Sequence, residues 1–367
     1  MIRLASIIDT FEAAFLAQYA ASALPSHQHA LSAMKHCRTA MSPKMQAQCV
    51  ACDEQVFVPH SCGHRQCPHC QAHESQQWLE RQLKKQVPGA YFLLTFTLPA
   101  ELRPLAWAHQ RTVYARMMQC CWETLRTFSL NDKSLQGTPG AVAVLHTHSR
   151  RLDYHPHVHL VMPAGAIDPK RRLWRTQRGK GKYLFNHKAL ARMFRGKLLA
   201  ALTEAGLALP QHYPEKWVVD CKHVGNGAKA LIYLGRYLYR GVIQEKDIIA
   251  CENGQVTFRY QNAKTRKREQ RTVSGVEFLR LLLQHVLPKG FRRARNFGFL
   301  HPNSKRLIQL LQYLHKLAPE RAMGLITKRP ALRCRCCGGD MTIVRTRIMP
   351  ALVPHHPPDV ITRAPVM

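Results

Sequence analysis

Acidic residues are scarce in this chain. Among its 367 residues, Asp and Glu number 22 while Lys and Arg number 54, which gives a formal net charge of +32 at pH 7. Self-repulsion on this scale is best tolerated when a polyanion neutralises it. The composition therefore favours a nucleic-acid partner, although a ribosomal-type binder or adhesion to a membrane surface would also fit the charge.

Long apolar runs are missing too. No stretch of about 18 uncharged apolar residues occurs, so we expect no membrane span. The first residues, MIRLASIIDTFEAAF, contain acids too early for a signal peptide, so a cytoplasmic protein is expected. The pattern GxxxxGK[ST] is absent, which argues against a fused helicase and a nucleotide cofactor. Hydrophobic residues still make up 46% of the chain, enough for a packed core.

The cysteines are numerous and unevenly placed. There are 13, an odd number without a secretion signal, so reduced thiols are expected rather than disulfides. Cys49 and Cys52 form one CxxC pair, and Cys67 and Cys70 form another after a gap of 14 residues. Because each CxxC turn aims two thiolates at one point, the four predict one structural Zn²⁺ site.

Other cysteines and histidines leave alternatives open. Five further side chains in the same stretch could replace a ligand or build a second site: Cys37, His60, Cys62, His64 and His69. Near the C-terminus, Cys334 and Cys337 form a single CxxC pair, for which metal binding stays open.

Hydrophobic periodicity predicts both helices and strands. Helices are expected over 6–22, 27–38, 73–86, 104–128, 186–205, 226–240, 275–287 and 303–317. Strands are expected over 91–97, 141–148, 155–162, 255–261 and 266–274. Residues 41–70 read as short turns, and the Pro-rich tail from 349 reads as flexible.

The segment YHPHVHLVM, residues 154–162, is the most informative in the chain. On a strand, alternation puts His155, His157 and His159 on one face and apolar residues on the other. Imidazoles two residues apart can bind one divalent cation. If the preceding strand turns back near 151–152, His146 lies opposite His157 and is our choice for a third ligand, with His148 and His155 in reserve.

A tyrosine pair follows downstream in ALIYLGRYLYR, residues 230–240. Tyr233 and Tyr237 are four residues apart and share one face of the expected helix, while Tyr239 points elsewhere. A tyrosine hydroxyl can attack phosphorus and hold the product covalently. Tyr pairs at this spacing are also common packing residues, so the pair gains weight only together with the histidine strand.

These segments resemble the transposases of the insertion sequence 91 family, within the HUH endonucleases (His–hydrophobic–His). The resemblance rests on the HPHVH strand, the YLGRY helix and the cysteine-rich start, together with YFLLTFTLP at 91–99, LHT at 145–147 and QHVLPKGF at 284–291. It covers roughly residues 35–300. One departure is the C-terminal RCRCCGG, which contains more cysteines than a simple pair.

The resemblance implies a fold and a chemistry. The fold is α+β, an antiparallel sheet flanked by helices, with an N-terminal helical and zinc-binding domain at 1–86, the nuclease domain at 87–330 and a Cys-containing segment with a flexible tail at 331–367. His157 and His159 would bind Mg²⁺ or Mn²⁺, and Tyr233 and Tyr237 would be the nucleophiles. The expected activity is single-strand DNA cleavage and joining through a 5′-phosphotyrosine in rolling-circle transposition, with DNA at transposon ends and target and the host replication machinery as partners.

Basic clusters with interleaved aromatic residues predict a path for single-stranded DNA, because charge follows the backbone and rings stack on bases. The candidates are Lys170, Arg171, Arg172, Trp174, Arg175, Arg178, Lys180, Lys182, Arg266, Lys267, Arg268, Arg292 and Arg293. The same clusters could be solvated loops.

Other classes of protein remain possible. A non-catalytic, zinc-dependent DNA-binding protein would explain the charge and the cysteines. A three-carboxylate transposase or a zinc-dependent hydrolase would cut DNA but leave no bond between protein and DNA. A covalent adduct separates the tyrosine mechanism from all three.

Overall fold

The structure, a computed structural model, describes residues 2–168, 170–171, 173–177, 184–239, 241–262, 265–317, 324 and 332–349, without the side chains of 236 and 237. The expected flexible tail lies outside these residues. Among the described residues, no helix is both long and apolar enough to cross a membrane.

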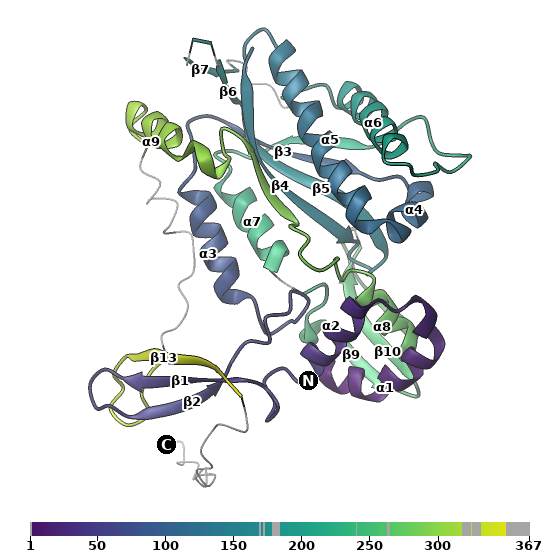
Figure 1. The fold of residues 1–367 in the computed structure, drawn as a ribbon, viewed down its shortest axis with the longest axis vertical. Coiled ribbons are helices and arrows are strands. Elements are labelled where there is room, and N and C mark those ends of the chain that lie inside the picture. Colours follow the sequence, from purple (N-terminus) through teal and green to yellow (C-terminus); the bar gives the residue numbers. More distant parts are fainter. Residues whose placement is uncertain are drawn as a thin grey trace.

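Helices and antiparallel strands alternate along the chain, which confirms the expected α+β class (Figure 1). The helices are α1 (Leu4–Tyr19), α2 (Pro25–Lys35), α3 (Ala72–Leu83), α4 (Arg103–Ala108), α5 (Gln110–Asn131), α6 (His187–Glu204), α7 (Ala228–Tyr239), α8 (Gly275–Leu283) and α9 (Lys305–Leu314). The strands are β1 (Lys44–Cys49), β2 (Gln55–Pro59), β3 (Tyr91–Thr97), β4 (Thr138–His148), β5 (Tyr154–Pro163), β6 (Gly165–Asp168), β7 (Leu173–Thr176), β8 (Val219–His223), β9 (Ile248–Glu252), β10 (Gln255–Gln261), β11 (Arg268–Ser274), β12 (Ala294–Gly298) and β13 (Met341–Ile348).

Two expectations differ from the observed elements. The single helix expected over 104–128 is divided into α4 and α5, because the backbone of His109 leaves the helical region at φ −126° and ψ 45°. The turn-like stretch 41–70 contains the strands β1 and β2.

The central sheet has the order β7-β6-β4-β5-β3-β8, and β12 pairs with β4. Every neighbouring pair in it is antiparallel. Strands β4 and β5 form the expected hairpin, and β3 continues the sheet beside β5. The sheet therefore places the histidine strand β5 between two neighbours.

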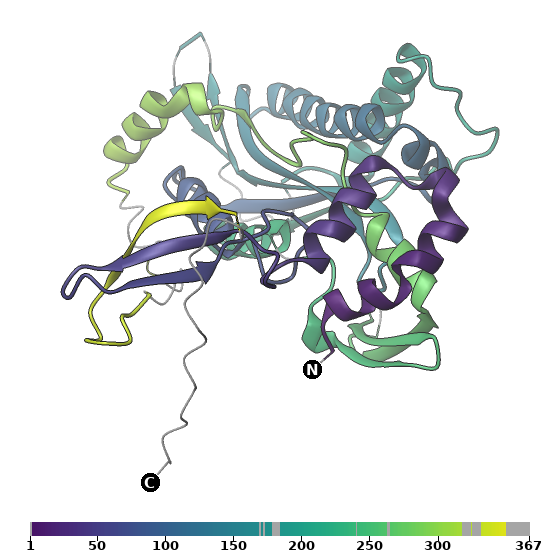
Figure 2. The ribbon, with the colours of Figure 1, turned by 60° about the horizontal axis from the view of Figure 1, so that its bottom comes forward.

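Helices cover both faces of this sheet (Figures 1 and 2). Alternation along β4 and β5 sends Leu145, Val158 and Leu160 into a core with α5 and α6. Val144 and Val161 point to the opposite face, where α3 and α7 pack. The histidines of β5 share the face of Val161, so the fold directs them toward α7.

A second core lies beside the sheet. Helices α1 and α2 pack on α8 and on the three-stranded sheet β11-β10-β9, the basic hairpin region expected at 255–274. Gly275 at the start of α8 lies so close to α1 that an added Cβ would come within 2.3 Å of the Phe11 ring. This close approach fixes α1 against α8.

A small sheet of order β13-β1-β2 brings the segment that follows α2 together with the C-terminal strand β13. Strand β13 pairs antiparallel with β1, with Cys49 opposite Met341. The segment 331–367 was expected to be separate from the N-terminal domain. Over Met341–Ile348 it instead forms an edge strand of the sheet that contains β1 and β2.

Candidate active site and cysteine clusters

The structure brings His146, His157 and His159 together. His146 pairs with His157 across β4 and β5, as the predicted register requires. The candidate ligand atoms of the three rings all lie within 4.8 Å of one another. The ring centroids of His146 and His159 are 4.3 Å apart, and those of His157 and His159 are 4.9 Å apart. We call these three residues the histidine cluster.

Hydrogen bonds orient two rings of the histidine cluster. Nδ1 of His157 lies 2.7 Å from the carbonyl oxygen of His155. Since a carbonyl only accepts, Nδ1 carries the proton and Nε2 keeps its lone pair. Nδ1 of His159 lies 3.0 Å from the Thr95 hydroxyl on β3, and donation to that oxygen leaves Nε2 of His159 in the same state.

Burial keeps these imidazoles uncharged. It lowers the pKa of His157 to about 4 and the pKa of His159 to about 3. It also lowers the pKa of His146, and the neighbouring His159 and His157 rings add to that effect. The neutral imidazole is the form that binds a metal ion, so the histidine cluster suits a divalent cation at neutral pH.

The reserve ligands, His148 and His155, line the same cavity as the histidine cluster but make other contacts. Nδ1 of His155 accepts a hydrogen bond of 2.7 Å from the Arg103 guanidinium. His148 lies past an irregularity in the β4–β5 pairing, and its ring is 5.2 Å from the His285 ring. Neither residue belongs to the histidine cluster.

Tyr233 lies in the same cavity as the histidine cluster. This cavity, of about 720 Å³, is lined by all three histidines and by Tyr233 from α7. The Tyr233 side chain is 47% exposed, so a substrate can reach it. Tyr237 is on the same helix, but its side chain lies outside the described residues.

Basic side chains of the second sheet form another wall of this cavity. Arg259 and Arg268 come from β10 and β11, and Lys246 precedes β9. Arg150 comes from the β4–β5 turn and donates to the Gln261 side chain at 2.8 Å. Of these, Arg268 was predicted from its charge run, whereas three were missed: Lys246 and Arg259 are isolated basic residues, and Arg150 has only Arg151 beside it.

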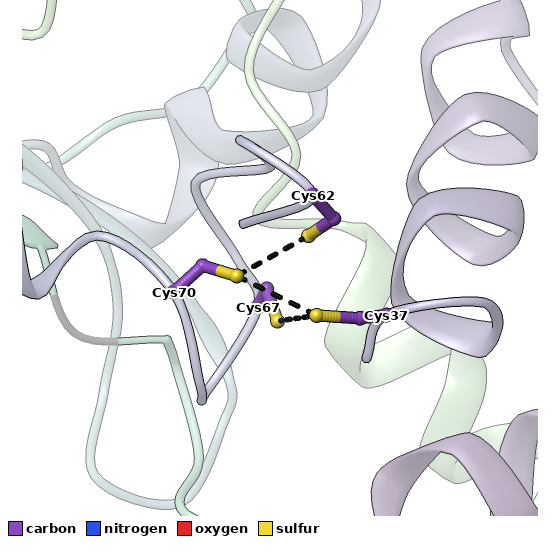
Figure 3. A group of neighbouring side chains, drawn as sticks. All are labelled: Cys37, Cys62, Cys67 and Cys70. Atoms are coloured by element: carbon purple, nitrogen blue, oxygen red, sulfur yellow. Dashed lines mark hydrogen bonds between the residues drawn. The ribbon is translucent and has the colours of Figure 1, made fainter. Parts of the chain in front are cut away.

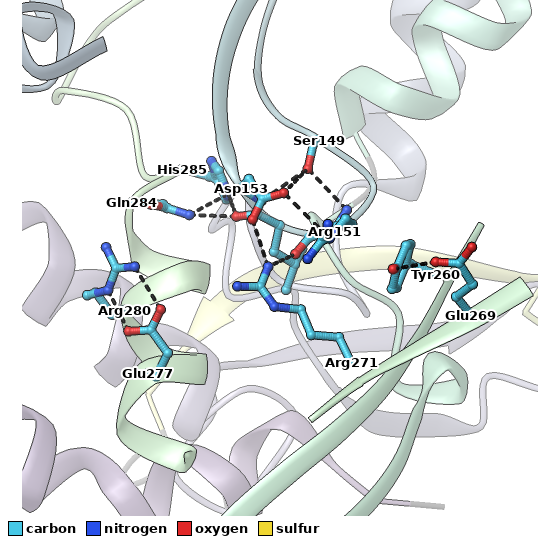
Figure 4. Close-up of polar contacts among 11 residues, drawn as sticks. Ser149, Arg151, Asp153, Tyr260, Glu269, Arg271, Glu277, Arg280, Gln284 and His285 are labelled. Carbon is cyan, nitrogen blue, oxygen red and sulfur yellow. Dashed lines mark hydrogen bonds and ion pairs between the residues drawn. The ribbon is translucent and has the colours of Figure 1, made fainter. Parts of the chain in front are cut away.

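The β4–β5 turn is held from two sides (Figure 4). Leu152 has a left-handed backbone at φ 68°, unusual for a branched residue, and its carbonyl oxygen accepts from Gln284 and His285 after α8. Arg271 of β11 donates to the Asp153 carboxylate at 2.8 Å and to the Arg151 carbonyl at 2.6 Å. These contacts fix the start of the histidine strand.

The cysteines form two groups rather than one. The first cysteine group is Cys37, Cys62, Cys67 and Cys70 (Figure 3), and the second cysteine group is Cys49, Cys52, Cys334 and Cys337. The predicted site of Cys49, Cys52, Cys67 and Cys70 is therefore wrong in its grouping. The two CxxC pairs are not combined, because Cys49 and Cys52 lie at the small sheet while Cys67 and Cys70 lie beside α2. The first pair is joined by Cys334 and Cys337, and the second pair by Cys37 and Cys62.

The first cysteine group supports the cavity through its loop. Cys37 Sγ lies 3.5 Å from Cys70 Sγ and 3.5 Å from Cys67 Sγ. Within the loop, Gln66 donates to the His285 carbonyl at 2.7 Å, and Arg65 donates to the Phe291 carbonyl at 2.8 Å. A metal ion in this group would thus hold the loop against the residues that support the β4–β5 turn.

The predicted DNA-binding residues are spread over several surfaces. Arg172, Arg178, Lys180 and Lys182 lie outside the described residues. The exposed ones are Lys170, Arg171, Arg266, Lys267, Arg268 and Arg292. Arg175 is engaged with Asp168 at 3.3 Å, and Arg293 is buried.

Trp174 has a packing role in the structure. Its ring lies edge-on to Phe299, with centroids 5.3 Å apart. A Cβ at Gly165 would come within 2.3 Å of the same indole. Its stacking on DNA bases stays a prediction.

Two family models match the chain. A model described as "Transposase zinc-binding domain" matches residues 7–98, and one described as "Putative transposase" matches residues 140–307. The first range contains the whole first cysteine group. The second contains the histidine cluster and both tyrosines.

Similar proteins carry the same description. A protein of Sinorhizobium fredii named "Putative transposase y4qJ" is 32% identical over 319 residues, which are 81% of this chain and 79% of that protein. The "Transposase for insertion sequence element IS801" of Pseudomonas savastanoi pv. phaseolicola is 29% identical over 329 residues, 79% of this chain and 76% of that protein.

Among solved structures, the conjugative relaxase TrwC in complex with DNA matches at a TM-score of 0.27 and 13% identity, over 62% of this chain and 74% of that chain. A likeness at this level supports no inference about function. The family models and the sequence relatives, by contrast, agree with each other over most of the chain. The chain is a DNA transposase and belongs to the insertion sequence 91 family.

Proposed function

We propose that this transposase cleaves and rejoins single-stranded DNA through a covalent 5′-phosphotyrosine, with Tyr233 as a nucleophile beside a cation held by the histidine cluster. The observation that carries the proposal is the shared cavity: Tyr233 and the three histidines line it together. A nucleophile and a cation site on one cavity are the two groups that this phosphoryl transfer needs.

The histidine cluster fits a divalent cation by its donor set. Three neutral imidazoles converge from two adjacent strands, and hydrogen bonds orient two of them. Nitrogen ligands suit Mn²⁺ better than Mg²⁺, so activity with either ion is expected. When bound, the cation would polarise a phosphate oxygen and stabilise the charge that develops there.

Cleavage by a tyrosine hydroxyl requires no nucleotide cofactor as an energy source. Attack by the Tyr233 oxygen forms a bond to phosphorus and breaks the bond from phosphorus to the 3′ oxygen. The phenolic proton is transferred to that oxygen, which leaves as a free 3′-OH. The phosphodiester energy is kept in the tyrosyl link, so a later 3′-OH can attack the link and rejoin the strand. Tyr237 would serve the second cleavage.

The basic wall of the cavity supports DNA as the ligand. Arg150, Arg259, Arg268 and Lys246 line the same space as the nucleophile, and Tyr260 adds an aromatic ring. Cationic side chains follow a phosphate backbone while a ring can stack on a base, which is the usual arrangement for single strands. The proposed substrates are single strands at the transposon ends and at the target. The host replication machinery is the proposed partner, and the bacterial cytoplasm is the proposed location.

A metal site built from carboxylates, which the three-carboxylate alternative requires, is not found in the described part of the chain. Within it, the groups of at least three His, Cys, Asp or Glu residues that could hold a metal are the two cysteine groups and the histidine cluster. None contains a carboxylate. The three-carboxylate mechanism therefore has less support than the tyrosine mechanism.

A covalent-adduct assay tests the proposal. The full chain is incubated with Mn²⁺ and a labelled single-stranded end oligonucleotide that acts as a suicide substrate, and the adduct is mapped by mass spectrometry. We expect a tyrosine peptide carrying DNA, and its loss in the Tyr233→Phe/Tyr237→Phe double variant. Cleavage without an adduct would indicate a hydrolase, and binding without cleavage would indicate a non-catalytic DNA-binding protein.

Tyr239→Phe is the matched control. Tyr239 is on the same helix, but its ring packs near Trp78 of α3, with centroids 6.4 Å apart. The Tyr239→Phe variant should form the adduct as the unmodified protein does. An undiminished adduct in the double variant would refute the assignment of the nucleophiles.

A further inference from the structure

We propose that the second cysteine group, Cys49, Cys52, Cys334 and Cys337, binds a second structural zinc ion that links the β1–β2 segment to the segment that leads into β13. Cys334 and Cys337 lie outside both ranges matched by the family models, 7–98 and 140–307. Cys49 and Cys52 lie within the range 7–98 matched by the zinc-binding model, so the site would combine two ligands of that domain with two from outside it, and its existence does not depend on the proposed mechanism.

The sulfur positions fit a tetrahedral metal site. Cys49 Sγ is 3.4 Å from Cys337 Sγ, and Cys52 Sγ is 3.7 Å from Cys334 Sγ. Zinc–sulfur bonds of about 2.3 Å at tetrahedral angles put sulfurs about 3.8 Å apart. Disulfide sulfurs would be only about 2.05 Å apart. Four thiols at these separations match shared coordination rather than two disulfides.

Each CxxC pair is a preformed turn. The Cys334 amide donates to the Gly339 carbonyl at 2.9 Å, and the Gly338 amide donates back to the Cys334 carbonyl at 3.0 Å. In the N-terminal turn, the Ala51 amide lies 3.4 Å from Cys49 Sγ and can donate to a thiolate there. Backbone amides aimed at sulfur are typical second partners of a bound thiolate.

The two turns also contact each other closely. The Val50 amide donates to the Asp340 carbonyl at 3.1 Å, across the pair of turns. At Gly339 a Cβ would lie 3.3 Å from Ala51 Cβ and 3.4 Å from Cys49 Sγ. Glycine leaves the space that brings the C-terminal pair of sulfurs against the N-terminal pair.

The consequence is a closed terminal sheet. β13 pairs with β1 directly after the Cys334–Cys337 turn, but most of its side chains are exposed. With so little buried surface, an edge strand has few contacts to hold it. The metal site would supply the missing restraint and fix β13 to β1.

Zinc counting with cysteine variants tests the site. Purified full-length protein should contain two zinc ions by elemental analysis. Cys334→Ser/Cys337→Ser and Cys49→Ser/Cys52→Ser should each contain one. Cys336 is exposed, lies in the same turn and is not part of the group, so Cys336→Ser is the matched control and should keep both ions. The proposal would be overturned if either double variant kept as many zinc ions as the unmodified protein, or if the unmodified protein contained only one.

A second measurement needs no variant. In the zinc-loaded protein, a thiol-alkylating reagent should label Cys336 at once and leave Cys334 and Cys337 unlabelled until a chelator is added. Hydrogen exchange of the β13 amides should speed up at the same chelator concentration. Immediate labelling of Cys334 and Cys337, or a rate of β13 amide exchange that the chelator does not change, would overturn the proposal. This holds even if the variants fail to fold.

Discussion

Replacing Thr95 by valine should weaken cation binding at the histidine cluster without unfolding the sheet. The Thr95 hydroxyl is 3.0 Å from His159 Nδ1, and this contact orients the imidazole with Nε2 left for a cation when Nδ1 donates. Valine keeps the β-branched shape that suits strand β3 and removes only the oxygen. The substitution therefore tests the hydrogen bond rather than the packing.

The expected loss follows from two magnitudes. A neutral hydrogen bond contributes a net 0.5–1.5 kcal/mol, roughly. Loss of a partner that orients a metal ligand typically costs about 10–100-fold in metal affinity. Since a tenfold change is about 1.4 kcal/mol, both point to about a tenfold weaker cation affinity for Thr95→Val.

Calorimetric titration with Mn²⁺ measures this affinity in protein that carries zinc in its cysteine groups only, because Mn²⁺ competes poorly for thiolate sites and leaves these groups occupied. Thr97→Val is the control: Thr97 lies on the same face of β3 but opposite His157, whose Nδ1 is already bonded to a backbone carbonyl. Equal Mn²⁺ affinity in Thr95→Val and the unmodified protein, or an equal loss in Thr97→Val, would refute the orientation argument.

Three other perturbations test the packing around the site. Gly275→Ala should lower the free energy of unfolding in denaturant by about 1–3 kcal/mol, because the new Cβ would overlap the Phe11 ring of α1. Burial lowers the pKa of His27 from 6.5 to about 4, so between these pH values the unfolded chain binds more protons than the folded one. The free energy of unfolding should therefore fall as the pH drops through that window. In His27→Gln, the denaturation midpoint should fall less steeply with acid. Gln284→Ala removes a bond to the Leu152 carbonyl and should cost roughly 0.5–1.5 kcal/mol by thermal unfolding, with a lower adduct yield.

The histidine strand could be predicted because its signal is local. Alternation along 154–162 separates imidazoles from apolar residues, and one hairpin turn fixes the register of His146 with His157. Both depend on neighbouring residues alone. The structure adds what the neighbouring strand supplies, namely the Thr95 contact to His159, which no pattern in β5 could indicate.

The strands β1, β2 and β13 were missed because their partners are distant in the sequence. β1 and β2 contain alternating polar residues, such as Gln46 and Gln48, that resemble an exposed turn region. Their third strand begins at Met341, so the pairing that stabilises them is invisible in residues 41–70. Strand propensity depends on such neighbours more than helix propensity does.

The charge pattern predicted the kind of ligand better than its path. Runs of Lys and Arg selected Arg175 and Arg293, which the fold engages or buries. The cavity instead takes Arg150 from the β4–β5 turn and Arg259 from β10, neither of which belongs to a long basic run. A run of charge along the chain measures local density, whereas a binding surface collects charges from elements that meet only after folding.

The cysteine grouping shows the same limit for metal ligands. A CxxC pair sets the distance between its own two sulfurs, but nothing in its spacing says which other pair completes the tetrahedron. Here α2 brings Cys37 to Cys67 and Cys70, while the β1–β13 pairing brings Cys334 to Cys52. The partner of each pair is therefore decided by the packing of whole elements, which the spacing within a CxxC pair does not encode.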